Sequence, residues 1–286
     1  MGIEQPLFFD CAGDALLGVL HHPGPASLDV GLLLVVGGPQ YRVGSHRQFV
    51  LLARALAAAG IPVFRFDYRG MGDSAGDPRD FEHIALDIRA ALDCFSAHRS
   101  GLRGVVLWGL CDAATANAFY AASDSRVLGQ IAVNPWVRTS SGAAQAFIRH
   151  YYLQRLMSRA FWHKVFRGDW PMAQAMRDFF RKLGHSRERA ADAQGENRAA
   201  LPGRLFSAQQ AAVGPTLVIL SGQDLTAREY DDRVSESPAW SAWMASPKVT
   251  LHRLDAADHT FSRAVWRDQV AEWTRDWMLA HFGRRG

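Results

Sequence analysis

Residues 105–119 read VVLWGLCDAATANAF, and this stretch decides the fold class. Its first part is a short apolar run that contains no charge, as in a strand buried on both faces of a sheet. Its second part is rich in small residues and predicts a closely packed helix. The strand passes into the helix through the sequence GLCDA at 109–113, which leaves room only for a sharp turn. A buried strand followed directly by a helix is typical of a parallel sheet covered by helices.

The same alternation of apolar and helical segments recurs along the chain. Strands are expected at 16–21, 30–36, 61–66, 102–108, 127–133, 216–220 and 249–254, and helices at 45–59, 80–98, 112–122 and 263–282. Ser45 and Gln48 have the spacing of a capping box, which predicts the start of the first helix. Right-handed crossovers then favour an α/β fold with a doubly wound, mostly parallel sheet. Ligands of such sheets bind beyond the carboxyl ends of the strands.

One long segment interrupts this alternation. Residues 136–212 are rich in aromatic side chains and begin with a helical pattern, whereas 184–200 are polar and predict a loop. We expect a helical lid insertion at 136–212, between a first core part at 1–135 and a second at 213–286. The alternative is a set of additional packed helices whose aromatic residues belong to the core.

Composition excludes several classes of protein. The chain has 286 residues, 48% of them hydrophobic and 21% charged, which is typical of a globular protein. Its apolar runs are shorter than the roughly 20 residues of a membrane span, and no signal peptide is visible, so we expect no membrane span and a cytoplasmic location. Three cysteines without a CxxC pair argue against a thiolate zinc site. The net charge of +4 is spread over scattered arginines, so we expect no nucleic acid partner. The oligomeric state stays open.

Cys111 is the candidate nucleophile. The turn at 109–113 follows the G-x-S-x-G pattern of a nucleophile elbow, with Cys in place of Ser and Ala113 in place of the last Gly. The sulfur would lie at a helix N-terminus, where the helix dipole favours a thiolate, although the neighbouring Asp112 opposes this effect. The alternative is that Cys111 is a small buried hydrophobic residue. Cys11 and Cys94 have no such context and are expected to be structural.

A nucleophile needs a base, and the base needs a group that orients it. Asp224 follows the strand expected at 216–220, and His259 follows the strand expected at 249–254. Their order after Cys111 is nucleophile, acid, histidine, which predicts a triad in which Asp224 holds the imidazole of His259. The alternatives are a turn-forming Asp224 and a surface histidine. Asp255 and Asp258 are further candidate acids, and Asn134 is a weaker one because it carries no charge.

The oxyanion of an acyl intermediate needs two backbone donors. One is expected to be the N–H of Asp112, and the other that of Gly38 or Gln40, because Pro39 has no N–H. The alternative for this loop is a plain tight turn. Candidate substrate-binding residues are Arg42, whose alternative is a solvated side chain, and Trp136. The loop at 67–74, DYRGMGDS, lacks the G-K-[ST] ending of a P-loop, so it is expected to brace neighbouring loops.

Taken together, the strings GGPQ, DYRGMGDS, GLCDAA, SGQD and DHTF resemble those of the α/β-hydrolase superfamily, over roughly residues 5–282. This resemblance implies the α/β-hydrolase fold. More narrowly, GGPQYRVGSHRQF with GLCDAA is similar to the exosortase A system-associated hydrolases of bacteria, whose genes accompany exopolysaccharide export and protein sorting. That implies a cellular setting and not a reaction. The cysteine also resembles that of dienelactone hydrolases, but Ala113 replaces their last elbow glycine.

These observations favour a cysteine hydrolase that cleaves a small-molecule ester or thioester through an acyl-enzyme intermediate, with no metal ion or organic cofactor. One alternative is an acyltransferase that uses a glycan or a lipid-linked acceptor. A second is a non-catalytic protein that uses the same fold as a docking surface for a partner.

Overall fold

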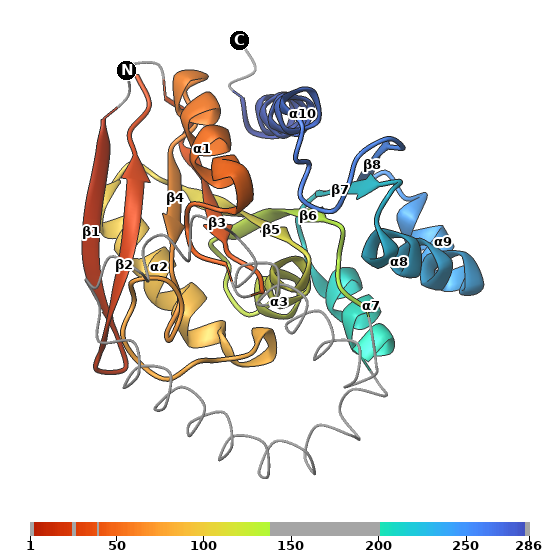
Figure 1. Cartoon of the computed structure of the whole chain (residues 1–286), viewed down its shortest axis with the longest axis horizontal. Helices are drawn as coiled ribbons and strands as arrows, with labels where there is room; N and C mark the ends of the chain where they lie inside the picture. The colour runs from red at the N-terminus through yellow and green to blue at the C-terminus, as the bar shows by residue number, and fades with distance from the viewer. Residues whose placement is uncertain (1–2, 25–26, 39, 138–200, 284–286) are drawn as a thin grey trace, which may run out of the picture. The chain divides into compact units, whose positions relative to one another are not determined.

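The computed structural model describes residues 3–24, 27–38, 40–137 and 201–283. Its centre is an eight-stranded sheet with the strand order β1-β2-β4-β3-β5-β6-β7-β8 (Figure 1). The strands are β1 (Glu4–Cys11), β2 (Asp14–His21), β3 (Val30–Val35), β4 (Val63–Phe66), β5 (Gly104–Leu110), β6 (Val127–Val133), β7 (Thr216–Ser221) and β8 (Val249–Leu254). From β4 to β8 every neighbouring pair is parallel, so their carboxyl ends share one edge of the sheet.

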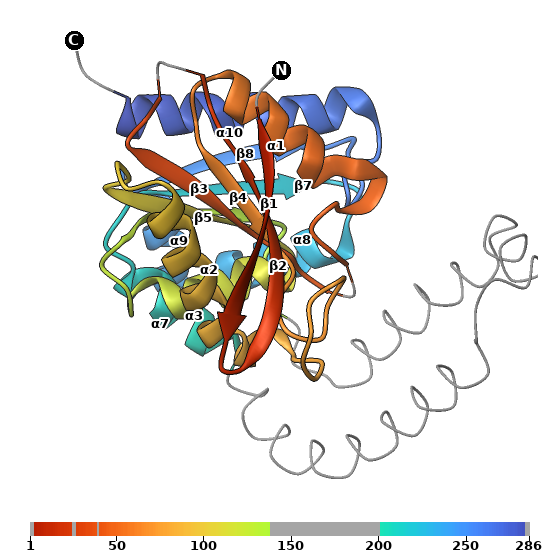
Figure 2. The same ribbon diagram turned by 90° about the vertical axis from the view of Figure 1, so that its left-hand side faces the viewer.

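Helices cover both faces of this sheet, as the view along it from β1 shows (Figure 2). Helices α1 (Gln48–Ala58) and α10 (Ala264–Phe282) lie together on one face, and α2 (Ala85–His98) and α3 (Asp112–Ala121) lie on the other. The described helices between β6 and β8 are α7 (Leu201–Ala211), α8 (Leu225–Glu236) and α9 (Pro238–Met244). The predicted doubly wound, mostly parallel α/β sheet is therefore confirmed.

The N-terminal hairpin was not predicted. β1 pairs antiparallel with β2 in an unbroken register from Glu4 opposite His21 to Cys11 opposite Asp14. β1 contains Pro6, which an edge strand tolerates because one side of its backbone has no partner strand. Its exposed side chains, which include Phe8, alternate with buried or half-buried ones, so it lacks the long hydrophobic run by which the central strands are recognised.

Two helix starts differ from the prediction. The capping box at Ser45 and Gln48 is wrong: a 3₁₀ turn, η1 (Ser45–Arg47), precedes α1, and the Ser45 side chain makes no capping hydrogen bond. Gly44 precedes η1 with a positive φ of 74°, and Arg47 precedes α1 with a positive φ of 62°. The left-handed backbone at Arg47 separates η1 from α1. The helix expected at 80–98 is likewise divided into η2 (Phe81–His83), capped by the Asp80 side chain, and α2.

Helices α8 and α9 were not predicted, although both carry start signals. The Asp224 carboxylate caps α8 by accepting hydrogen bonds from two backbone N–H groups of its first turn. The Ser237 hydroxyl caps α9, which has Pro238 in its first turn. The strongly polar sequence of α8 has few apolar residues to form a stripe, which explains why the hydrophobic pattern did not reveal it.

The chain divides into two compact units, one of Met1–Val137 with Leu205–Gly286 and one of Arg138–Arg204. The insertion expected at 136–212 overlaps the second unit. Its aromatic part and the loop expected at 184–200 lie outside the described residues, so the lid stays a prediction. None of the helices in the described part of the chain is both long and apolar enough to cross a membrane.

Candidate active site

The elbow, residues 109–113, holds Cys111 in an unusual backbone conformation. Cys111 directly follows β5 and occupies the N-cap position of α3 with φ 65° and ψ −127°, a region that costs a non-glycine residue of the order of 1–3 kcal/mol. The turn is fixed from both sides: the Cys111 N–H donates to the Val133 carbonyl at 2.9 Å, and the Cys111 carbonyl accepts from the Trp136 N–H at 3.3 Å. A Cβ at Gly109 would lie 2.6 Å from the Ala113 carbonyl carbon, so only glycine fits there.

Asp224 and His259 meet after β7 and β8. The Asp224 Oδ2 atom lies 2.8 Å from the His259 Nδ1 atom. The same carboxylate accepts hydrogen bonds from the Thr226 and Ala227 N–H groups at 3.1 Å, so the start of α8 fixes its orientation. The Asp224 side chain is 7% exposed and that of His259 18%. A buried, backbone-held carboxylate can therefore orient the imidazole and stabilise its protonated form.

Of the two other candidate acids, Asp258 is engaged within its own loop. The Asp258 carboxylate accepts hydrogen bonds from the N–H and hydroxyl groups of Ser262, within its own loop. Asp255 contributes its backbone carbonyl to the Gln223 side chain. Among the described residues, Asp224 is the acid for which a hydrogen bond to the His259 ring is seen.

Asn134 has a role that the sequence analysis missed. Its side chain donates to the Ser221 hydroxyl at 2.8 Å and to the His259 carbonyl at 3.3 Å, and it accepts from the Ser221 N–H at 2.9 Å. It is fully buried and has φ 45°. Asn134 thereby connects the end of β6 to the end of β7 and to the histidine loop. Its position directly after a predicted strand was the available signal.

These contacts place Cys111 and His259 at the same corner of the sheet. Val133, which accepts the hydrogen bond from Cys111, is the neighbour of Asn134, which donates to the backbone of His259. In addition, His259 lies close enough to Asp112, the residue after Cys111, for its protonated form to lower the pKa of that carboxyl group. The strand ends thus place the elbow and the hydrogen-bonded pair of Asp224 and His259 at the same edge of the sheet, and the contact between Cys111 and His259 stays a prediction.

The loop after β3 is held by the Asp112 side chain. The Gly38 N–H donates to Asp112 Oδ2 at 3.0 Å, so this predicted oxyanion donor is already engaged in the described state. Gln40 is half-buried, and its Oε1 atom has no hydrogen-bond partner within the described ranges. Burial raises the pKa of Asp112 to about 6, while the Gly38 N–H and His259 act in the opposite direction.

Arg42 is not a solvated side chain, and that interpretation is wrong. Its guanidinium forms ion pairs with Asp67 and Asp73 and is only 14% exposed. Both carboxylates raise the pKa of Arg42, against the lowering effect of its burial. A substrate anion would have to compete with these two carboxylates for the guanidinium.

The loop at 67–74 is tied to its surroundings through Asp67 and Ser74. The buried Asp67 carboxylate accepts hydrogen bonds from the backbone N–H groups of Arg42 and Asp73. The Ser74 hydroxyl donates to the Asp67 carbonyl and accepts from the Leu17 N–H of β2. These contacts connect the loop at 67–74 to the loop after β3 and to strand β2.

Trp136 is buried, and its backbone is fixed beside the elbow. Its carbonyl accepts a hydrogen bond from the Thr115 hydroxyl of α3 at 2.7 Å. Together with the contact from the Trp136 N–H to the Cys111 carbonyl, this hydrogen bond holds the chain after β6 against the start of α3. Substrate binding by Trp136 stays a proposal.

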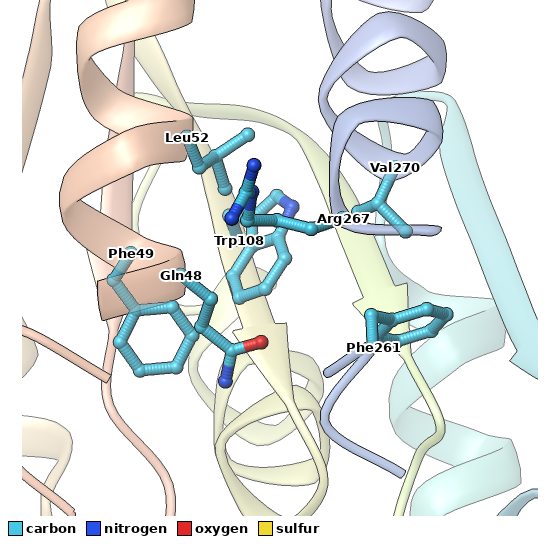
Figure 3. A pocket seen from close by; sticks show the side chains of 7 residues that line it. All are labelled: Gln48, Phe49, Leu52, Trp108, Phe261, Arg267 and Val270. Atoms are coloured by element: carbon cyan, nitrogen blue, oxygen red, sulfur yellow. The ribbon is translucent and has the colours of Figure 1, made fainter. Parts of the chain in front are cut away.

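A small cavity lies between α1, β5 and α10 (Figure 3). It measures about 20 Å³ and is lined by Gln48, Phe49, Leu52, Trp108, Phe261, Arg267 and Val270. The Gln48 Nε2 and Trp108 Nε1 atoms are buried without a hydrogen-bond partner in the described part of the chain. This volume suits one water molecule and is too small for an acyl substrate.

Comparison with known proteins supplies the family. The model of the alpha/beta hydrolase family matches residues 32–273. The human protein ABHD12B is 38% identical over 73 residues, which are 26% of this chain and 19% of the length of ABHD12B. The lysophosphatidylserine lipase ABHD12 of Xenopus tropicalis is 38% identical over 78 residues, which are 27% of this chain and 19% of the length of the lipase. This chain thus spans about a fifth of the length of these curated relatives.

Solved structures agree on the fold. The Pyrococcus furiosus esterase Pf2001 superimposes with a TM-score of 0.65 at 14% identity, over 99% of this chain and 94% of its own. A dienelactone hydrolase from Anabaena variabilis superimposes with a TM-score of 0.62 at 15% identity, over 98% of this chain and 99% of the hydrolase. Because the family model covers most of the sequence and the strand order, helix layers and elbow accompany it, the chain belongs to the alpha/beta hydrolase family.

Proposed function

We propose that the protein hydrolyses a carboxylic ester or thioester, with Cys111 as nucleophile, His259 as general base and acid, and Asp224 as the group that orients His259. The observation that carries this proposal is the 2.8 Å contact between Asp224 and His259, beside a cysteine held at φ 65°. A cysteine that was only a hydrophobic filler would gain nothing from a strained backbone at the end of a strand.

In the first half of the reaction, His259 Nε2 takes the proton of the Cys111 thiol. The thiolate attacks the acyl carbon, and the bond to the leaving group breaks as His259 returns the proton to the departing oxygen or sulfur. In the second half, His259 takes a proton from water, and the resulting hydroxide attacks the acyl-thioester. The Cys111 sulfur then leaves and regains its proton, which restores the enzyme.

The developing oxyanion requires backbone donors. The Asp112 N–H supplies one at the start of α3, where the helix dipole adds to its effect. Gln40 is the candidate for the second, because the Gly38 N–H is bound to Asp112 and Pro39 has none.

The names of similar proteins support the choice of substrate class. The similar chains include a lysophosphatidylserine lipase and an esterase. The similarity of GGPQYRVGSHRQF and GLCDAA to exosortase-associated hydrolases supports a setting in bacterial glycan export, within the cytoplasm.

The experiment is a screen of p-nitrophenyl esters and acyl thioesters of increasing chain length. We expect Cys111→Ala to lower kcat/KM by at least about 10³-fold without unfolding the protein. Cys111→Ser should keep less activity than wild type, because a hydroxyl is a far weaker acid than a thiol. Cys94→Ala removes another buried thiol, away from the elbow, and should leave turnover unchanged. Wild-type turnover by Cys111→Ala would exclude the proposed nucleophile.

A further inference from the structure

The carboxyl group of Asp112 lies between the elbow and the loop that follows β3. Its Oδ2 atom accepts the hydrogen bond from the Gly38 N–H at 3.0 Å. Its Oδ1 atom lies against Gly37, so closely that a Cβ on Gly37 would collide with it. Gly37 therefore leaves room for this side chain, and the hydrogen bond from Gly38 to it holds in place the loop that carries the candidate oxyanion donor.

The Oδ1 atom of this carboxyl group is cut off from solvent. Asp112 as a residue is half-buried, but its Oδ1 atom is sealed from solvent and makes no hydrogen bond within the described residues. An ionised carboxylate needs several well-placed donors to replace its hydration. The N–H groups of Gly38, Ala113 and Asp112 itself favour the charged form, but burial outweighs them. Burial of the carboxyl group, with Oδ1 cut off from solvent, raises its pKa to about 6, so the group is neutral below that pH and ionised above it.

The charges that face Asp112 offer limited compensation. His259 faces it from the loop after β8, and its positive form stabilises the carboxylate. Tyr68 faces it from the loop after β4, and burial raises the pKa of that phenol well above its usual value, so it carries no charge at neutral pH. Cys111 is its neighbour in the chain, and the thiolate of Cys111 would repel the carboxylate.

We propose that Asp112 is a positioning residue whose effect depends on whether its carboxyl group is protonated. The neutral carboxyl holds the loop after β3 against the elbow, and its ionisation slows the attack of Cys111 on the acyl substrate. This inference rests on the proposed hydrolase function. Thiolate and oxyanion are both negative, so a carboxylate beside them disfavours both. The proton released on ionisation goes to solvent, and no covalent bond of the protein changes.

The first test compares the pH profiles of wild type and Asp112→Asn on the same p-nitrophenyl ester. Asparagine has the same shape and keeps an acceptor for the Gly38 N–H, but it cannot ionise. We expect the ratio of kcat/KM, variant over wild type, to be near 1 at pH 5 and to rise to about 10 or more at pH 8. Asp29→Asn makes the same chemical change at an exposed residue before β3, at the opposite end of the strands, and should give a ratio of 1 throughout.

The second test needs no substrate. Alkylation of Cys111 by iodoacetamide, followed on its tryptic peptide by mass spectrometry, should be about 10-fold faster in Asp112→Asn than in wild type at pH 7.5. Faster alkylation of Asp112→Asn would support the effect of Asp112 on Cys111, whether or not the wild type is an active hydrolase. If the wild type hydrolysed none of the esters or thioesters, that result alone would count against the proposed function. Equal alkylation rates at every pH would overturn the role of Asp112, even in an active hydrolase.

Discussion

Cys111 combines a reactive side chain with a backbone conformation that side chains disfavour. Its φ of 65° puts the sulfur at the start of α3, and contacts from β6 and Trp136 hold the turn there. Such strain persists only where the surrounding structure enforces it, and here the small residues Gly109 and Ala113 allow the turn to close. The backbone strain at Cys111 therefore lowers the stability of the fold, but it places the Cys111 sulfur at the start of α3.

Replacing this residue by glycine should reveal the strain. We expect Cys111→Gly to raise the free energy of unfolding by about 1 kcal/mol relative to Cys111→Ala, because glycine adopts positive φ without a steric penalty. Urea denaturation of the two variants, both without the thiol, gives the comparison. Equal midpoints for the two would show that the elbow is unstrained.

Asp112 should leave a signature in the pH dependence of stability. Its folded pKa of about 6 lies above the value of 3.8 for an unperturbed side chain, so the stability it contributes is complete below pH 3.8 and is lost as the pH rises through 6. We expect Asp112→Asn to raise the free energy of unfolding by about 1–2 kcal/mol at pH 7.5 and to have little effect near pH 4. Denaturant titrations at both values measure this, and a gain of the same size at both would contradict the assignment.

At the scale of elements, the site depends on how four strand ends are joined. β5, β6, β7 and β8 are parallel neighbours, and each is followed by a residue of the site. Asn134 links three of these ends through one amide group. The geometry of the histidine loop should therefore depend on this amide.

We expect Asn134→Ala to lower the free energy of unfolding by about 2–3 kcal/mol, because it leaves the buried N–H of Ser221 without its partner. It should also lower kcat more than it changes KM, since His259 loses a backbone contact. Asn117→Ala is the matched control: this buried amide makes no hydrogen bond within the described ranges, so its loss should cost less. Equal costs for the two variants would contradict the proposed linkage.

The sequence predicted elements best where hydrophobic runs are continuous. The central strands, from β3 to β7, are buried on both faces and stood out for this reason, whereas β1 at the edge and the polar helix α8 did not. The pairing of Asp224 with His259 followed from their order after successive strands. The contact between Asp112 and Gly38 could not be predicted, because it joins loops 74 residues apart and depends on side-chain placement.

For the whole molecule, two buried groups act on stability in opposite directions between pH 4 and 6.5. His21 is buried in β2, and its Nε2 accepts a hydrogen bond from the Arg65 Nε at 2.8 Å. Burial and the charge of Arg65 lower the pKa of His21 from 6.5 to about 4. Its contribution to stability is therefore complete above pH 6.5 and is lost as the pH falls toward 4, while that of Asp112 is gained over the same fall.

The glutamine variant of His21 should separate these effects. Glutamine can still accept from Arg65 but does not titrate. We expect His21→Gln to become more stable relative to wild type by about 2–3 kcal/mol as the pH falls from 7 to 4.5. Thermal or urea unfolding at the two pH values measures this difference, and parallel curves would show that His21 titrates in the folded protein as it does in a peptide.

The most direct measurement on the site is the capture of its covalent intermediate. Wild-type protein is mixed with an excess of a p-nitrophenyl ester, quenched with acid within milliseconds to seconds, and digested for mass spectrometry. We expect the acyl mass on the peptide that contains Cys111, none on that peptide in Cys111→Ala, and far slower labelling in His259→Ala. An acyl group on another residue, or ester turnover with Cys111 unlabelled at every time point, would contradict a cysteine nucleophile at the elbow.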